Sequence, residues 1–285
     1  MVLDSTISLP MVGSVTLKLT IKYLTTTKDD DAVLLGCEFS LTDDKVITAF
    51  AEYLLHFASE VTVESLKKEG FHVDKISKTL DFTYVKNAED FVNVLKLRAK
   101  CFSSCKNKEI SYTDMSDAYD LNAHILIVKH KGRIVGSTRL NLANSYDQHE
   151  NSKYVCYPSN LPNPQEVTEA SRLCVDGEYR GADVAYELIN HIFLVSILAR
   201  KNYLIVSAKN KELEFYEQIG FKKLNTSFIH PVTPVKHELL ILNILDIING
   251  RGISPQIWGR YFKKLADHLK LRDDSSNRPT KIAKT

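Results

Sequence analysis

The sequence lacks the features that mark secreted, membrane-spanning and nucleic-acid-binding proteins. Its five cysteines show no paired spacing, so neither a disulfide framework nor a zinc site is predicted. No apolar run is long enough to cross a bilayer, and the N-terminus has no signal-peptide pattern. The formal net charge is only +2, which provides no global field for nucleic acid or an anionic membrane. We therefore expect a cytoplasmic protein with no metal ion, nucleic acid or membrane as a partner.

The chain does have a globular composition and room for two domains. With 285 residues, of which 44% are hydrophobic and 25% charged, it can bury a core over most of its length. The pattern of elements predicts a small β-rich module, a linker or extra helix, a larger α/β domain and a flexible basic tail. The predicted boundaries of these four parts are 1–58, 59–79, 80–270 and 271–285.

The first of these parts shows a strand pattern followed by a helix pattern. Residues 14–23 alternate between apolar and polar side chains, as a half-buried strand does, and 32–39 predict a second strand after a polar loop. A helix follows over about 43–57, with Thr42 or Asp43 as its N-cap.

From residue 80 onward strands and helices alternate, which predicts a mixed α/β sheet flanked by helices. Lys131-Gly132 is expected to turn a hairpin, and Gly220 to end a helix. The predicted strands are 82–85, 124–129, 133–142, 167–175 and 203–208, and the predicted helices are 88–101, 183–200 and 211–219.

The segment 169–181 is the most informative one for function. An apolar strand leads into a short Gly/Arg turn and then a helix, which directs backbone N–H groups and a helix dipole at an anion. Glu169 and Arg172, three residues apart, place a carboxylate and a guanidinium upstream. This pattern indicates group transfer from a phosphopantetheine-type carrier. The predicted donor-binding residues are Leu173, Cys174, Val175, Arg180 and Gly181.

From about residue 80 the chain resembles the GNAT-type N-acyltransferases. Phe215-Tyr-Glu-Gln-Ile-Gly-Phe221 is similar to that family's "FYEKLGF" motif. Other pieces resemble, in order, the branch that contains acyl-homoserine-lactone synthases and N-acyl amino acid synthases. These pieces are Leu97-Arg98 with Phe102, Asp117 with Asp120 ahead of the run 124–128, and Gly136, Arg139 and Leu140 ahead of Glu169-Ala-Ser-Arg172.

The resemblance implies a GNAT-like fold and an enzyme of bacterial type. The implied reaction transfers a long-chain fatty acyl group from acyl carrier protein, or from acyl-CoA, to the amine of an amino acid. Because the acyl donor is a substrate, no resident cofactor is expected. Two alternatives stay open: an acyl-homoserine-lactone (autoinducer) synthase, and a non-catalytic signalling or adaptor protein on a GNAT-like scaffold. A homodimer is a further open alternative.

Two departures from the family patterns bear on the substrates. Classical acetyl-CoA enzymes carry R/Q-x-x-G-x-G/A after the fourth strand, whereas here Asp183 stands at a glycine position after Arg180. A carboxylate there is expected to crowd and repel a pyrophosphate, which favours acyl carrier protein as donor. The tryptophan that lactone synthases carry shortly after the helix near Phe102 is absent, which favours an amino acid over S-adenosylmethionine as acceptor.

Thioester aminolysis needs a base, an oxyanion site and an acid for the departing thiolate. Glu169 is the candidate base if burial raises its pKa, with a salt bridge to Arg172 or Arg139 as the structural alternative. Backbone N–H groups near 173–175 are candidates for the oxyanion site, most easily at a β-bulge. Tyr216 is the acid that the resemblance implies, and core packing is its alternative.

Charged side chains suit the ammonium and carboxylate of an amino acid acceptor. Each also has a structural alternative: a solvated helix face for Arg98, an N-cap or turn for Asp117 and Asp120, and an ordinary surface position for Arg180. The predicted substrate-binding residues are Arg98, Phe102, Asp117, Asp120, Arg139 and Arg172.

The N-terminal module is faintly similar to the second half of a PilZ domain, through Val12-Gly13, the run 35–39 and Asp43-Asp44. PilZ domains bind cyclic di-GMP through an arginine motif, but no arginine precedes Arg98. The resemblance therefore implies a docking or dimer module, without cyclic di-GMP as a ligand.

Overall fold

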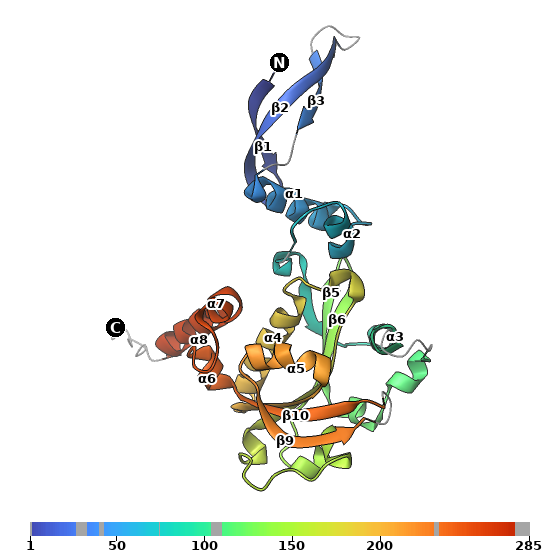
Figure 1. Ribbon diagram of the computed structural model, residues 1–285, viewed down its shortest axis with the longest axis vertical. Helices are drawn as coiled ribbons and strands as arrows, with labels where there is room; N and C mark the ends of the chain where they lie inside the picture. The colour runs from blue at the N-terminus through green and yellow to red at the C-terminus, as the bar shows by residue number, and fades with distance from the viewer. Residues whose placement is uncertain are drawn as a thin grey trace, which may run out of the picture. The chain divides into compact units, whose positions relative to one another are not determined.

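A computed structural model describes residues 2–26, 33–39, 43–73, 75–103, 110–230 and 234–276, with the backbone alone for 271–276 (Figure 1). The chain divides into two units, Met1–Leu80 with Gly177–Asp183, and Asp81–Asp176 with Val184–Thr285. In the described ranges, no helix combines the length and the apolar character that spanning a membrane requires.

The first unit contains a three-stranded antiparallel sheet and two helices. Its strands follow the order β1-β2-β3. The predicted helix over about 43–57 is present and Asp43 caps it, accepting the N–H of Lys45 at 2.8 Å; Thr42, the alternative cap, lies outside the described residues. The elements are β1 (Val2–Leu9), β2 (Gly13–Thr26), β3 (Val33–Phe39), α1 (Asp44–Phe57), α2 (Val63–Lys68) and the short 3-10 turns η1 (Ser77–Thr79) and η7 (Gly177–Tyr179).

One feature of the first unit differs from the sequence prediction, and one open alternative is decided. Strand β1 was not predicted, although it pairs with β2 along its whole length; its apolar side chains Val2 and Leu3 are exposed, and Leu9 at its end is buried. The segment 59–79, predicted as a linker or an extra helix, contains α2, whose capping box joins Thr62 and Ser65.

The second unit is built on a seven-stranded sheet of order β4-β5-β6-β7-β8-β10-β9 (Figure 1). Only the β7–β8 pair is parallel. This is the mixed α/β sheet that the sequence predicts. The strands are β4 (Asp81–Tyr84), β5 (His124–His130), β6 (Arg133–Asn141), β7 (Val167–Val175), β8 (Tyr203–Lys209), β9 (Lys222–Ile229) and β10 (Lys236–Asn243).

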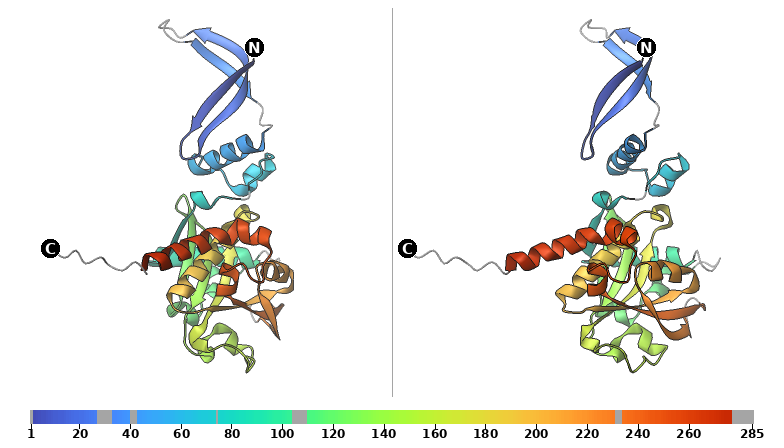
Figure 2. Two further views of the ribbon diagram at one scale, coloured as in Figure 1. Left: turned by 90° about the vertical axis from the view of Figure 1, so that its left-hand side faces the viewer. Right: turned by 60° about the vertical axis from the view of Figure 1, so that its left-hand side comes forward.

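Helices cover both faces of this sheet (Figure 1). Helix α3 packs on one face, and α4, α5 and the C-terminal helices pack on the other, where α4 and α8 lie side by side (Figure 2). Helix α8 continues past residue 270, where the tail was predicted to begin. The helices are α3 (Ala88–Ser103), α4 (Val184–Leu198), α5 (Asn210–Gln218), α6 (Ile244–Ile248), α7 (Pro255–Ile257), a π-helical turn (Trp258–Phe262) and α8 (Lys263–Ser276).

Local chemistry explains why the hairpin β5–β6 turns where the sequence predicts. Lys131 and Gly132 both have positive φ angles, 50° and 81°, as a two-residue type I′ turn requires.

Further along β6, a Cβ at Gly136 would lie 3.3 Å from Leu188 and Val184 of α4, so the glycine permits close packing of α4 on the sheet.

Phe193 of α4 is fully buried in the largest apolar cluster, whereas Leu198 of the same helix is 64% exposed. We predict that Phe193→Ala lowers the free energy of unfolding by about 3–5 kcal/mol, because it leaves a cavity. The control Leu198→Ala is expected to change it by less than about 0.5 kcal/mol. Urea unfolding followed by circular dichroism measures both, and equal losses would contradict this packing.

Candidate active site

Strand β7 carries the central features of the candidate site. It has a bulge opposite β6, and on its other side it separates from β8. Its pairing with β6 shifts between Ser137↔Cys174 and Arg139↔Ser171, so β7 holds one more residue than β6 over this step. Arg172 lies in the bulge with a φ of 57°, a backbone conformation that only a constrained site favours for arginine. The oxyanion site was predicted to form most easily at such a bulge, and it stays a prediction.

The parallel pairing of β7 with β8 is short. It runs from Val167↔Tyr203 to Glu169↔Ile205 and ends there, although β7 continues to Val175 and β8 to Lys209. The edge of β7 beyond Glu169 is therefore unpaired with β8, and a bound extended group would find backbone donors and acceptors there. Glu169 lies at the point where β7 and β8 begin to separate.

Glu169 is 1% exposed and is held by N–H donors rather than by arginines. Its Oε2 accepts the backbone N–H of Glu150 at 2.6 Å, and its Oε1 accepts the backbone N–H and the Nδ2 of Asn151 at 2.9 and 2.7 Å. Burial raises the pKa of Glu169 to about 7, against the effect of these hydrogen bonds. In the described part of the chain, Glu169 does not form the salt bridge to Arg172 or Arg139 that was its structural alternative.

An aromatic group that includes Tyr157 lies near this carboxylate. Tyr146, His149 and Tyr157 contact one another with ring centroids 4.7–6.1 Å apart. Burial lowers the pKa of His149 to about 4, so the imidazole is neutral at pH 7. Burial raises the pKa of Tyr157, and the nearby Glu169 raises it further. Neutral rings of this kind keep the surroundings of Glu169 poorly solvated, which agrees with its raised pKa.

Arg139 joins several of the predicted residues in one buried network. The side chain is 1% exposed, and its Nη1 lies 2.5 Å from Asp117 Oδ1 and 3.1 Å from Asp120 Oδ1. Its Nη2 donates to Glu150 Oε2 at 2.6 Å, and its Nε to Ser171 Oγ at 3.1 Å. A buried guanidinium needs such a set of partners to offset its desolvation.

Two further arginines complete the network. Arg172 Nη2 donates to Asp117 Oδ2 and to Glu150 Oε1, both at 2.9 Å. Arg98, which is fully buried, donates from Nη1 to both carboxylate oxygens of Asp120 at 2.9 Å. The predicted arginines and aspartates therefore converge, and the solvated-face alternative for Arg98 is wrong. Asp117 also caps η3 (Ala118–Leu121), as its structural alternative predicted, and its role in substrate binding stays a prediction.

Sequence reasoning missed Glu150 and Asn151, which connect the network to Glu169. They lie at the start of η5 (Glu150–Lys153), after η4 (Tyr146–Gln148), in a stretch without periodicity. Glu150 binds Arg139 and Arg172 through its side chain and Glu169 through its backbone N–H. Nothing in the local sequence distinguishes these two residues from ordinary loop residues.

A cavity of about 610 Å³ with a mixed polar and apolar lining adjoins the network. The ring of Tyr119 separates them, with Arg139 Cζ 5.7 Å from its centroid and Lys153 Nζ 4.4 Å from it. Asn141 and Gln148 also line this cavity. In the described part of the chain, no group of three or more His, Cys, Asp or Glu side chains is arranged to hold a metal ion.

The predicted donor strand and thiolate acid lie in apolar surroundings. Cys174 is buried against α3, where Cys101 Sγ donates to the carbonyl of Val175 at 3.4 Å. Tyr216 lies in the largest apolar cluster, and burial raises its pKa, as do Glu212 and Cys174, so the phenol keeps its proton. Phe102 packs under Lys209, whose Nζ is 5.2 Å from the ring centroid.

The turn with Arg180 and Gly181 belongs to the first unit, where Lys67 Nζ donates to the carbonyl of Arg180 at 3.2 Å. The side chain of Asp183 is buried and accepts the N–H of Ile76 at 2.8 Å. Asp183 thus holds a neighbouring segment, and its predicted repulsion of a pyrophosphate stays a prediction. Lys67 is a cation at this turn that sequence reasoning did not find.

The sequence profile of the family "N-acyl amino acid synthase FeeM" matches residues 93–243, more than half of the chain. The chain belongs to this family. It is a GNAT-type N-acyltransferase, and its seven-stranded mixed sheet is the one that this assignment predicts. Because the match begins at residue 93, the PilZ-like resemblance of the first module stays a prediction. No curated protein matches the sequence.

Solved structures of acyltransferases are similar to part of this N-acyl amino acid synthase family member. FeeM from uncultured soil microbes matches with a TM-score of 0.49 and 10% identity, over 60% of this chain and 94% of its own. The AHL synthase LasI matches with 0.46 and 15%, over 58% and 89%. An acyl-CoA N-acyltransferase from Pseudomonas aeruginosa matches with 0.44 and 16%, over 57% and 98%.

Asp117 supplies a test of the ion-pair network. Although burial opposes ionisation, Arg139 and Arg172 lower its pKa from 3.8 to about 2. A carboxylate with a depressed pKa stabilises the fold above its unfolded-state pKa and loses that contribution as the pH falls towards 2. We predict that Asp117→Asn lowers the free energy of unfolding by about 2 kcal/mol at pH 7, with a difference that shrinks between pH 4 and pH 2.

Urea unfolding at a series of pH values measures this difference. Asp114→Asn, at an exposed position nearby, is the matched control and should show no such pH dependence. A loss of stability that stays constant down to pH 2 would contradict the assigned ion pairs.

Proposed function

We propose that this N-acyltransferase joins a long-chain fatty acyl group, carried as a thioester on acyl carrier protein, to the amine of a free amino acid, and releases an N-acyl amino acid. Acyl-CoA is the alternative donor. The observation that carries the proposal is the position of Glu169, a buried carboxylate with a pKa raised to about 7, where β7 and β8 begin to separate. A base with this pKa can accept an ammonium proton near neutral pH.

The donor thioester is assigned to the open edge of β7. Residues 173–175 follow the bulge and have no β8 partner, so their backbone suits an extended pantetheine arm and its thioester carbonyl. Arg180 and Gly181 remain our candidates for the phosphate of the arm. Acyl carrier protein is preferred over acyl-CoA because Asp183 replaces a glycine of the coenzyme A motif.

The acceptor is assigned to the side of the network formed by Asp117, Arg139 and Arg172. This side offers carboxylates for an ammonium group and guanidinium groups for a carboxylate. The adjoining cavity, with Lys153 at its wall, has room for an amino acid side chain. These charges suit a free amino acid better than an uncharged amine.

The reaction then follows with conserved atoms and charges. Glu169 takes a proton from the acceptor ammonium, directly or through water, and the freed amine attacks the thioester carbon. Backbone N–H groups of β7 stabilise the oxyanion, and collapse of the tetrahedral intermediate breaks the C–S bond. Tyr216, which keeps its proton in the apolar core, is the proposed donor to the departing thiolate, and it is reprotonated by the second proton that the nitrogen loses as the amide forms. The products are an amide and a free thiol.

The test is incubation of the full-length protein with a long-chain acyl carrier thioester and a mixture of the twenty amino acids. Mass spectrometry of the products identifies the acceptor, and thiol release reports turnover. An N-acyl amino acid is the expected product. A lactone formed when S-adenosylmethionine is added, with no N-acyl amino acid formed, would contradict the acceptor assignment.

Glu169→Gln tests the base. Because the rate depends on the deprotonated carboxylate, kcat/KM of the wild type should rise with pH through a midpoint near the pKa of about 7 and then level off. At pH 8 the variant is predicted to lose a factor of about 10² to 10⁴ in kcat/KM, and with it the pH dependence near 7.

Glu166→Gln is the matched control, because this exposed carboxylate lies just before β7. It should leave both the rate and its pH profile unchanged. A Glu169→Gln variant that keeps wild-type kcat/KM at pH 8 would exclude Glu169 as the base.

A further inference from the structure

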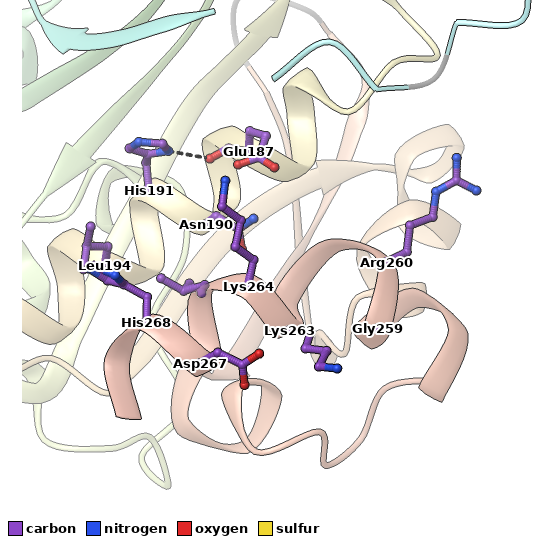
Figure 3. Close-up of a pocket in the computed structure, with 11 residues that line it drawn as sticks. Glu187, Asn190, His191, Leu194, Gly259, Arg260, Lys263, Lys264, Asp267 and His268 are labelled. Atoms are coloured by element: carbon purple, nitrogen blue, oxygen red, sulfur yellow. Dashed lines mark hydrogen bonds between the residues drawn. The ribbon is translucent and has the colours of Figure 1, made fainter. Parts of the chain in front are cut away.

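A second cavity lies away from the candidate active site, in a groove between α4 and α8 (Figure 3). Its volume is about 620 Å³, in the range of small-molecule sites. On β6, Leu140 follows Arg139, and on β7, Ala170 follows Glu169. Leu140 and Ala170 pack in the apolar cluster under α4 and α8. Neighbouring strand residues face opposite sides of a sheet, so the groove and the ion-pair network lie on opposite sides.

The wall formed by α4 presents hydrogen-bond acceptors. Asn190 is 92% buried, and while its Nδ2 donates to the carbonyl of Tyr261 at 2.8 Å, its Oδ1 has no hydrogen-bond partner. His191 Nδ1 contacts the carbonyl of Glu187 at 2.8 Å, and burial lowers the pKa of His191. A neutral imidazole that donates from Nδ1 leaves Nε2 as an acceptor.

The wall formed by α8 presents more basic than acidic side chains. Lys263 and Lys264 are exposed and line the groove together with Arg260, the imidazole of His268 and the carboxylate of Asp267 (Figure 3). The π-helical turn Trp258–Phe262 leads into this wall, and such turns often mark functional sites. Apolar surface of Leu194 and Leu265 lies between the two walls.

We propose that this groove binds an N-acyl amino acid, the class of product assigned to the enzyme above. The identity of the ligand rests on the proposed function. Its amide N–H would donate to Asn190 Oδ1, its carboxylate would lie against Lys263 and Lys264, and its alkyl chain would cover Leu194 and Leu265. An acceptor wall, a cationic wall and an apolar floor match the three parts of such a molecule.

The test is isothermal titration calorimetry of the full-length protein with N-dodecanoylglycine below its micelle concentration. Lys263→Glu and Lys264→Glu, each placing a like charge beside the ligand carboxylate, are expected to weaken binding about tenfold or more. Lys270→Glu makes the same charge change on an exposed residue of α8 outside the groove, and should change Kd less than about twofold. Equal affinity for all of these proteins would overturn the proposal.

Dodecanoic acid tests the amide. It keeps the carboxylate and the chain but offers no N–H to Asn190, and should bind the wild type about tenfold more weakly than N-dodecanoylglycine. In Asn190→Leu this preference should disappear; a preference that persists in a folded Asn190→Leu protein would contradict the assigned contact.

This titration requires no turnover. If the protein makes no N-acyl amino acid, the proposed function is refuted. The titration would still report whether these lysines bind the probe.

Discussion

The ion pairs of Arg139 are the interaction on which the candidate site depends. The guanidinium is 1% exposed, and its charge is tolerated there because Asp117, Asp120 and Glu150 surround it. These partners come from separate loops, so the pairs hold the loops against β6. The backbone N–H of Glu150 donates to Glu169, so the network also positions the proposed base.

Strand β7 brings together the groups that the proposed reaction needs. One strand carries the buried carboxylate of Glu169, the bulge at Arg172 and the edge that β8 does not pair. A pKa near neutrality for Glu169 follows from removing the carboxylate from water while leaving it only neutral N–H donors. Had Arg139 or Arg172 paired with Glu169 directly, the carboxylate would be a weak base.

The sequence predicted most elements whose cause is local. The hairpin at Lys131-Gly132 follows from turn chemistry, and the helix of residues 44–57 from its cap and its apolar spacing. It also selected Glu169 from the pattern of 169–181, and Arg139 and Asp117 through a family resemblance. It could not show that Glu150 joins them, because that contact depends on how a loop without periodicity folds. Strand β1 was missed because its pairing with β2 leaves apolar side chains exposed.

The central claim is that burial keeps Glu169 poised as a base near neutral pH. A carbon-13 NMR titration of the Glu169 side-chain carboxyl, assigned by its loss in Glu169→Gln, measures this most directly. The account predicts a midpoint near the pKa of about 7. A midpoint at the ordinary glutamate value, about 4.3, would contradict it.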